Sequence, residues 1–140
     1  MEAETLLRAI YTSVPADGLG ADDIDAILRT ARRRNAELSL TGALMYGRGS
    51  FVQILEGPAA SLDLLLDAIR KDPRHRDMTI VLRDPVEARE FAGWAMAYVG
   101  EDDAVASLDG VRPLAELVAD LKTDGRIAAS FVGSVRRRLG

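Results

Sequence analysis

Three polar side chains occupy positions where the sequence predicts the interior of the protein. Alternation along the strand-like run 49–58 places Gln53 between two large apolar neighbours on one face. Tyr11 lies on one face of another predicted strand, and Asn35 continues the apolar stripe of a predicted helix. A buried amide without partners costs roughly 1–3 kcal/mol. Backbone contacts would explain each side chain alone, but the three together predict a shared polar ligand.

The composition limits the chemistry that other side chains could supply. The 140 residues include no cysteine and a single histidine, His75. Disulfides, thiolate metal sites and cysteine nucleophiles are therefore excluded, and a histidine metal cluster or a serine triad is disfavoured. The sequence therefore offers few side chains for conventional hydrolytic catalysis.

The overall charge and hydropathy are those of an ordinary soluble domain. Hydrophobic residues make up 48% of the chain and charged residues 29%, and the net charge is −4. The negative charge argues against general nucleic-acid binding. No apolar run is long enough for a membrane span and the N-terminus lacks the form of a signal peptide, so we expect a cytoplasmic protein without membrane contact.

The predicted elements bring the three polar side chains together. Strands are expected at 6–13, in two runs within 40–57 joined by the turn 47–49, at 78–83 and at 91–99, and helices at 22–35 and 61–71. The order βαββαββ predicts an α+β ferredoxin-like sandwich with both helices on one sheet face. Residues 1–99 would form this core, and residues 100–140 two amphipathic helices on the other face.

Several motifs together resemble one family. They are RAIYTS at 8–13, ARRRN at 31–35, LTGALMYGRGSFVQILEGP at 40–58, DPRHRDM at 72–78 and REFAGWAM at 89–96. In combination they look like a BLUF domain, a blue-light sensor module that binds FAD noncovalently. The similarity extends over residues 5–99 without an evident gap.

The resemblance implies where a flavin would bind. The ring would lie between the two helices, with Ile27 and Ile69 on its faces, and would contact Tyr11, Asn35 and Gln53. Cations near the phosphates of FAD would come from residues at the helix ends, although solvated charge explains these equally well. The implied cofactor residues are Tyr11, Ser13, Ile27, Arg32, Asn35, Gln53, Ile69, Arg74 and His75, with Arg34 a further candidate cation.

The resemblance also implies a photoreaction. Light-driven electron and proton transfer between Tyr11 and the flavin would let the Gln53 amide turn over or change tautomer, which exchanges donor for acceptor without a change in charge. Trp94 and Met96 match the residues that would report this change, although core packing explains Trp94 equally well, and which of the two lies nearer the flavin is left open. Ala31, Arg34 and Ala95 depart from many relatives, and these departures bear on the photocycle rate.

The sequence also bears on how the protein would pass on its signal and on which other functions it could have. No effector domain is evident after residue 99, so we expect no enzyme activity and an output through a downstream protein or through self-association, for example as a homodimer. A small hydrolase on this fold and a flavin-free interaction module are the alternatives, and FAD is not distinguished from FMN. The absence of cysteine excludes a covalent flavin–thiol adduct.

Overall fold

The structure is a computed structural model that describes residues 5–16, 18, 20–47, 50–73, 75–99, 132–133 and 135–137. The elements within residues 6–99 follow the predicted order βαββαββ. They are β1 (Leu6–Pro15), α1 (Ala21–Leu38), β2 (Thr41–Gly47), β3 (Ser50–Pro58), α2 (Ala59–Arg70), β4 (His75–Pro85) and β5 (Ala97–Val99).

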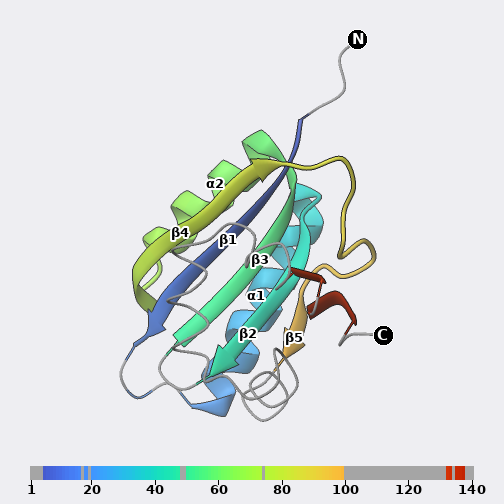
Figure 1. The fold of residues 1–140 in the computed structure, drawn as a ribbon. Coiled ribbons are helices and arrows are strands. Elements are labelled where there is room, and N and C mark those ends of the chain that lie inside the picture. The colour runs from blue at the N-terminus through green and yellow to red at the C-terminus, as the bar shows by residue number, and fades with distance from the viewer. Residues whose placement is uncertain are drawn as a thin grey trace.

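One mixed sheet contains the five strands in the order β4-β1-β3-β2-β5 (Figure 1). The pairs β1–β3, β1–β4 and β2–β3 are antiparallel, and β2–β5 is parallel. The first four strands have the arrangement of a ferredoxin-like sheet, which confirms the predicted α+β class. The register sets Tyr11 of β1 directly opposite Gln53 of β3, so two of the three predicted polar side chains are cross-strand neighbours.

Both α1 and α2 cover the same face of the sheet (Figure 1). Apolar side chains at helical spacing meet those at alternate strand positions, as expected for amphipathic helices on a half-buried sheet. The core between the layers includes Leu7, Ala9, Tyr11, Ile24, Leu28, Leu44, Phe51, Leu55, Leu62, Leu65, Leu66 and Ile69. None of the helices in the described part of the chain is long and apolar enough to cross a membrane.

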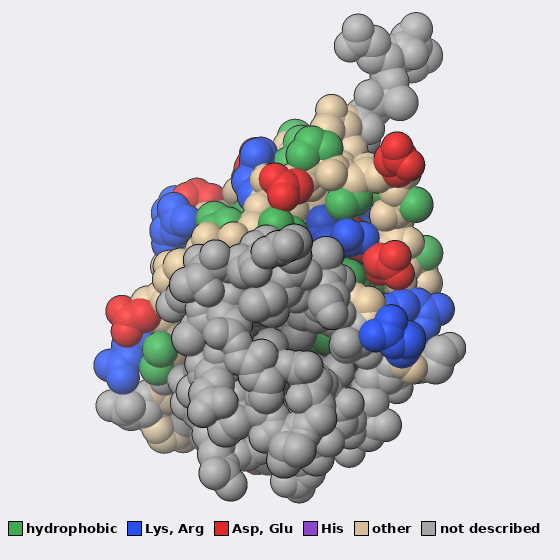
Figure 2. All heavy atoms as spheres, in the orientation of Figure 1, with side chains coloured by type: hydrophobic (Ala, Val, Ile, Leu, Met, Phe, Trp, Pro, Cys, Tyr) green, Lys and Arg blue, Asp and Glu red, His purple; other side chains and the backbone are tan. Residues whose placement is uncertain are grey.

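The opposite face of the sheet is buried as well. Its buried apolar side chains include Ile10, Ala43, Met45, Val52 and Ile54. Val132 and Val135, in the helical residues 132–133 and 135–137, are also buried. The remainder of the two predicted C-terminal helices lies outside the described residues. Around the rim of this face, acidic and basic side chains are interspersed (Figure 2).

The prediction of a last strand over 91–99 is wrong before Ala97. Residues 86–96, hereafter the 86–96 segment, form an irregular connection, and β5 comprises only Ala97–Val99. Gly93 has φ +90°, and this left-handed conformation interrupts the alternation of an extended strand. Side chains at alternate positions consequently do not share one face, and Trp94 is exposed while Met96 is buried.

The first helix also differs from its predicted bounds. α1 continues past Asn35 to Leu38, and Ser39 ends it in the left-handed conformation with φ 60°. Asn35 therefore lies inside the helix and does not cap its end. Its side chain faces the sheet, where it has a different partner, described below.

Candidate ligand-binding site

A pocket opens between α1 and α2 on the helix-covered face of the sheet. It contains about 510 Å³ of space free of atoms, counting the part that is open to solvent. Ile27 of α1 and Ile69 of α2 line it from the two helices. The full lining is Tyr11, Ile27, Thr30, Ala31, Arg34, Asn35, Leu44, Phe51, Gln53, Leu65, Ile69 and Asp72. All three of the polar side chains singled out in the sequence therefore border one pocket.

Tyr11 and Gln53 form a buried polar pair at this pocket. The Tyr11 hydroxyl donates a hydrogen bond to Oε1 of Gln53. Nε2 of Gln53 lies 3.5 Å from the Met96 sulfur, which is a weak acceptor. The amide is thus oriented by one good hydrogen bond and one weak one, so its orientation depends on the proton that Tyr11 donates.

Asn35 contributes an unpartnered acceptor. The residue is fully buried, and its Nδ2 donates to the backbone oxygen of Ala95 at 2.6 Å. Its Oδ1 is also buried but has no hydrogen-bond partner within the described part of the chain. A buried acceptor left in this state costs free energy, so a ligand with a hydrogen-bond donor at this place in the pocket would relieve the cost.

The environment of Tyr11 favours the protonated phenol. Burial raises the pKa of its hydroxyl above the ordinary value of 10.0, and the negative charge of Asp72 raises the pKa further. Tyr11 therefore remains a hydrogen-bond donor at physiological pH. Loss of its proton alone would leave a buried anion near Asp72.

Met96 and not Trp94 lies beside Gln53. The Met96 side chain is buried, whereas Trp94 is 38% exposed. Nε of Arg32 donates to the backbone oxygen of Met96 at 3.0 Å, which fixes the chain next to the pocket. The sequence left open which of the two residues approaches the site, because regular alternation would have put both on one side of a strand.

The other predicted site residues differ in whether they line the pocket. Ser13 is buried on β1 and Arg32 contacts the 86–96 segment, and neither belongs to the described lining of the pocket. Arg34 does line it. Arg74 and the side chain of His75 lie outside the described residues.

Sequence reasoning missed some polar residues. Asp72 borders the pocket two residues after the last residue of α2, just beyond the predicted helix end at residue 71. Glu56 is fully buried on the opposite face of the sheet and is bound by Arg8, Thr41 and two backbone amides. The signal for Glu56 was present, since alternation from Val52 and Ile54 places it on an apolar face.

The pocket fits a flat heteroaromatic ligand such as a flavin. Apolar side chains of two helices would lie against the faces of such a ring, and its N–H and carbonyl groups complement the unpartnered Asn35 Oδ1 and the amide of Gln53. Among the described residues, no group of three or more acidic or histidine side chains could hold a metal ion.

The fold and the site define a ferredoxin-like α+β domain with a pocket between its two helices. A family model described as "BLUF: Sensors of blue-light using FAD" matches residues 6–97. The chain belongs to this BLUF family of flavin-binding blue-light sensors, as its sequence motifs indicated.

Individual relatives support the assignment. The photoactivated adenylate cyclase subunit beta of Euglena longa is 42% identical over 99 residues, which cover 70% of this chain and 12% of that protein. The dark-state structure of BlrB, a BLUF protein, is 28% identical with a TM-score of 0.83 and covers 96% of this chain and 97% of that chain. Klebsiella pneumoniae BlrP1 with FMN and cyclic diGMP is 28% identical with a TM-score of 0.66, over 91% of this chain and 34% of that one. The chain therefore spans only about an eighth of the cyclase relative.

Proposed function

We propose that this chain binds FAD noncovalently between α1 and α2 and acts as a blue-light photosensor without catalytic activity of its own. The observation that carries the proposal is the polar edge of the pocket. There, the buried Tyr11–Gln53 hydrogen bond lies with an Asn35 oxygen that has no partner among the residues the structure describes. Such an edge leaves hydrogen-bonding capacity for a ligand with both donors and acceptors.

The residues of the chain supply a reversible hydrogen-bond switch. When bound, the flavin supplies absorption of blue light and acceptance of an electron and a proton. Tyr11 gives up both together and later regains them, because loss of the proton alone is opposed by burial and by Asp72. While Tyr11 lacks the proton, Oε1 of Gln53 loses its donor, and the amide settles in a new orientation or tautomer.

Met96 would carry this change out of the pocket. In the described state its sulfur faces the amide Nε2 of Gln53. Turning the amide over would direct an oxygen at the sulfur, which has no proton to donate. The contact would weaken, and residues 92–96 would shift against α1. The altered surface would then signal to a downstream protein or change self-association, for example in a homodimer.

The choice of FAD over FMN is a separate part of the proposal. A groove between α1 and α2 shares Arg34 and Leu65 with the pocket and is also lined by Glu37, Asp67 and Lys71, and Lys71 is paired with Asp67 at 3.1 Å. Arg34 would lie along the phosphate-bearing tail of either flavin. Chromatography of the cofactor released from the purified protein distinguishes the two, and recovery of FMN alone would contradict the assignment of FAD.

Spectroscopy of the purified protein tests the function directly. The protein should be yellow, and blue light should shift its flavin absorption to the red, with full reversal in the dark. Gln53→Leu should retain the flavin and lose the shift, because leucine has no donor or acceptor to exchange. A colourless protein would favour a flavin-free interaction module, and a normal shift in Gln53→Leu would remove Gln53 from the mechanism.

A further inference from the structure

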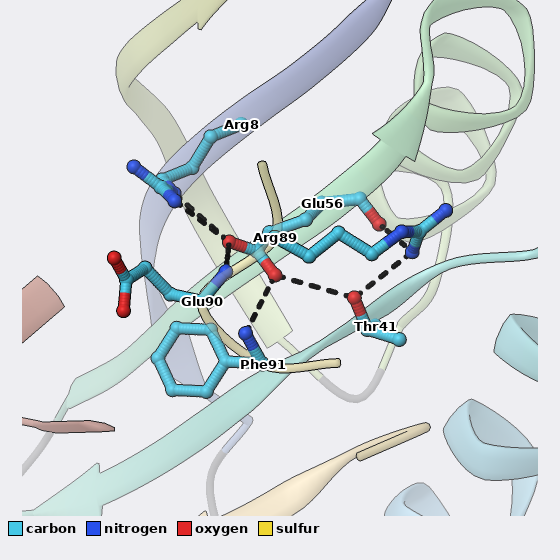
Figure 3. A network of polar contacts seen from close by, with 6 residues as sticks. All are labelled: Arg8, Thr41, Glu56, Arg89, Glu90 and Phe91. Atoms are coloured by element: carbon cyan, nitrogen blue, oxygen red, sulfur yellow. Dashed lines mark hydrogen bonds and ion pairs between the residues drawn. The ribbon is translucent and has the colours of Figure 1, made fainter. Parts of the chain in front are cut away.

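A second buried polar cluster lies on the face of the sheet away from the pocket (Figure 3). It consists of Glu56, the side chains of Arg8, Thr41 and Arg89, and the backbone N–H groups of Glu90 and Phe91, and is hereafter the Glu56 cluster. Glu56 is three positions beyond Gln53 on β3, and its side chain points to the other face. The switch residue and the cluster thus share one strand.

The Glu56 carboxylate joins the sheet to the 86–96 segment. Oε2 accepts from Arg8 Nη2 at 2.9 Å and from the N–H of Glu90 at 2.8 Å. Oε1 accepts from the hydroxyl of Thr41 at 3.2 Å and from the N–H of Phe91 at 2.9 Å. Charge-assisted bonds to backbone N–H groups are among the stronger hydrogen bonds in proteins, so this end of the segment is firmly attached.

Arg89 adds bonds in the other direction, from the segment to the sheet. Its Nη1 donates to the hydroxyl of Thr41 at 2.9 Å and to the backbone oxygen of Glu56 at 3.1 Å. Its Nη2 donates to the backbone oxygen of Ser39 at 2.7 Å. Phe91 itself is fully buried. Residues 89–91 are therefore held by side-chain bonds, backbone bonds and packing at once.

The far end of the same segment is held at the pocket. The backbone oxygens of Ala95 and Met96 accept from Asn35 and Arg32 of α1, and the Met96 sulfur contacts Gln53. Between the two attachments, the Trp94 oxygen accepts from the N–H of Gly42 at 3.0 Å. At this end, each backbone oxygen of the segment accepts a single hydrogen bond from a different residue. At the other end, the Glu56 carboxylate alone accepts hydrogen bonds from four residues.

We propose that the Glu56 cluster is the fixed anchor of the 86–96 segment and positions Met96 against Gln53 for the photoreaction. This inference rests on the proposed function as a flavin photosensor. Glu56 and Arg89 are positioning residues, because they act through the segment and contact neither Gln53 nor the pocket. When the Gln53 amide turns, residues 92–96 would move about residues 89–91, which remain attached to the sheet.

Fluorescence of Trp94 tests the anchor without reference to flavin chemistry. Trp94 is the only tryptophan of the chain, so its quenching by acrylamide in the dark reports on the 86–96 segment alone. Glu56→Gln should raise the quenching constant by about twofold, since an indole now 38% exposed gains roughly 2.6-fold at most on full exposure. Arg89→Met, which leaves Arg8 and Glu56 paired, should raise it in the same direction.

The rate of dark recovery tests the positioning role. Glu56→Gln should shorten recovery by at least about threefold, because a loosened segment rearranges more easily, and this acceleration should vanish in a Met96→Leu background. Non-additivity of this kind is expected only if Glu56 acts through Met96. Asp63→Asn, which removes an exposed carboxylate paired with Arg83, is the control and should change neither readout.

The outcomes separate the two proposals. Unchanged Trp94 quenching in folded Glu56→Gln and Arg89→Met proteins would overturn the anchor. Increased quenching with unaltered or additive recovery rates would overturn the positioning role. A wild-type protein without a light-induced shift would overturn the photosensor function and with it the positioning role, while the Trp94 measurement would still decide whether the anchor exists.

Discussion

Arg8 should contribute strongly to stability although it is remote from the pocket. Its Nε and Nη2 donate to Oε2 of Glu56 at 3.1 and 2.9 Å. The Arg8 side chain is 15% exposed and that of Glu56 is 0% exposed. In Arg8→Met the new side chain still covers part of the apolar surface that the arginine stem covered, so the main loss is the positive charge beside a buried carboxylate.

The expected loss in the free energy of unfolding is about 3 kcal/mol. Removing one partner of a buried ion pair costs about 3–5 kcal/mol, because the other charge remains buried and uncompensated. Glu56 retains the hydroxyl of Thr41 and the two backbone N–H donors of residues 90 and 91, which favours the lower end of that range. A change of this size lowers the folding equilibrium constant by roughly a hundredfold.

Urea unfolding followed by circular dichroism measures this effect. Arg83→Met is the matched control, since it removes an arginine whose ion pair with Asp63 is exposed, at 42% and 53% for the two side chains. Exposed ion pairs are screened by water and contribute little to stability. The control should therefore unfold near the urea midpoint of the wild type. If Arg8→Met lost no more stability than Arg83→Met, the reasoning about the buried carboxylate would be refuted.

Three further predictions concern the pocket and the sheet. Tyr11→Phe should bind flavin but show no forward photoreaction in absorption spectroscopy, and a normal photocycle would rule out Tyr11 as the donor. Because the pKa of Tyr11 is raised above 10.0 only in the folded state, its contribution to stability is complete below pH 10 and is lost as the pH rises. Above pH 10, denaturant titrations should show wild type losing about 1.4 kcal/mol per pH unit relative to Tyr11→Phe, and parallel profiles would contradict this. Gly42→Ala should destabilise the protein by about 3 kcal/mol in the same titrations, because the methyl group of the alanine would collide with the backbone oxygen of Ile54. If the variant were as stable as the wild type, β2 and β3 could not lie so close together.

The features that could be predicted from sequence are those governed by local periodicity. Alternation along β1 and β3 placed Tyr11 and Gln53 on the inner face, and helical spacing placed Ile27 and Ile69 beside them. The order of the elements then determined the sheet, since short connections leave few ways to arrange βαββαβ. The fold class could be reached in this way, whereas the position of the pocket between the helices was implied by the resemblance to the BLUF family.

The features that could not be predicted depend on contacts between residues distant in the chain. Alternating residues over 91–99 are typical of a strand, but the bonds from Glu56 to residues 90 and 91 hold that region in another conformation. Met96 is consequently buried and Trp94 exposed in a connection whose alternation is interrupted at Gly93. A search for buried polar residues on both faces of β3 would have found Glu56, although not its partners.

The outer strand of the sheet has a consequence for the behaviour of the protein at high concentration. Among the strands of the described residues, β4 is the last on its side of the sheet, and a long edge without a paired neighbour invites strands of other molecules to pair with it. Its pairing with β1 shifts register between Ile10 and Tyr11 and again between Thr12 and Val14, and Asp77 has φ 53°. Such irregularities, with charged Arg83 and Asp84 near its end, make the edge a poor template for strand addition. The register shifts that disfavour strand addition at this edge thus belong to the same strand pair that carries Tyr11.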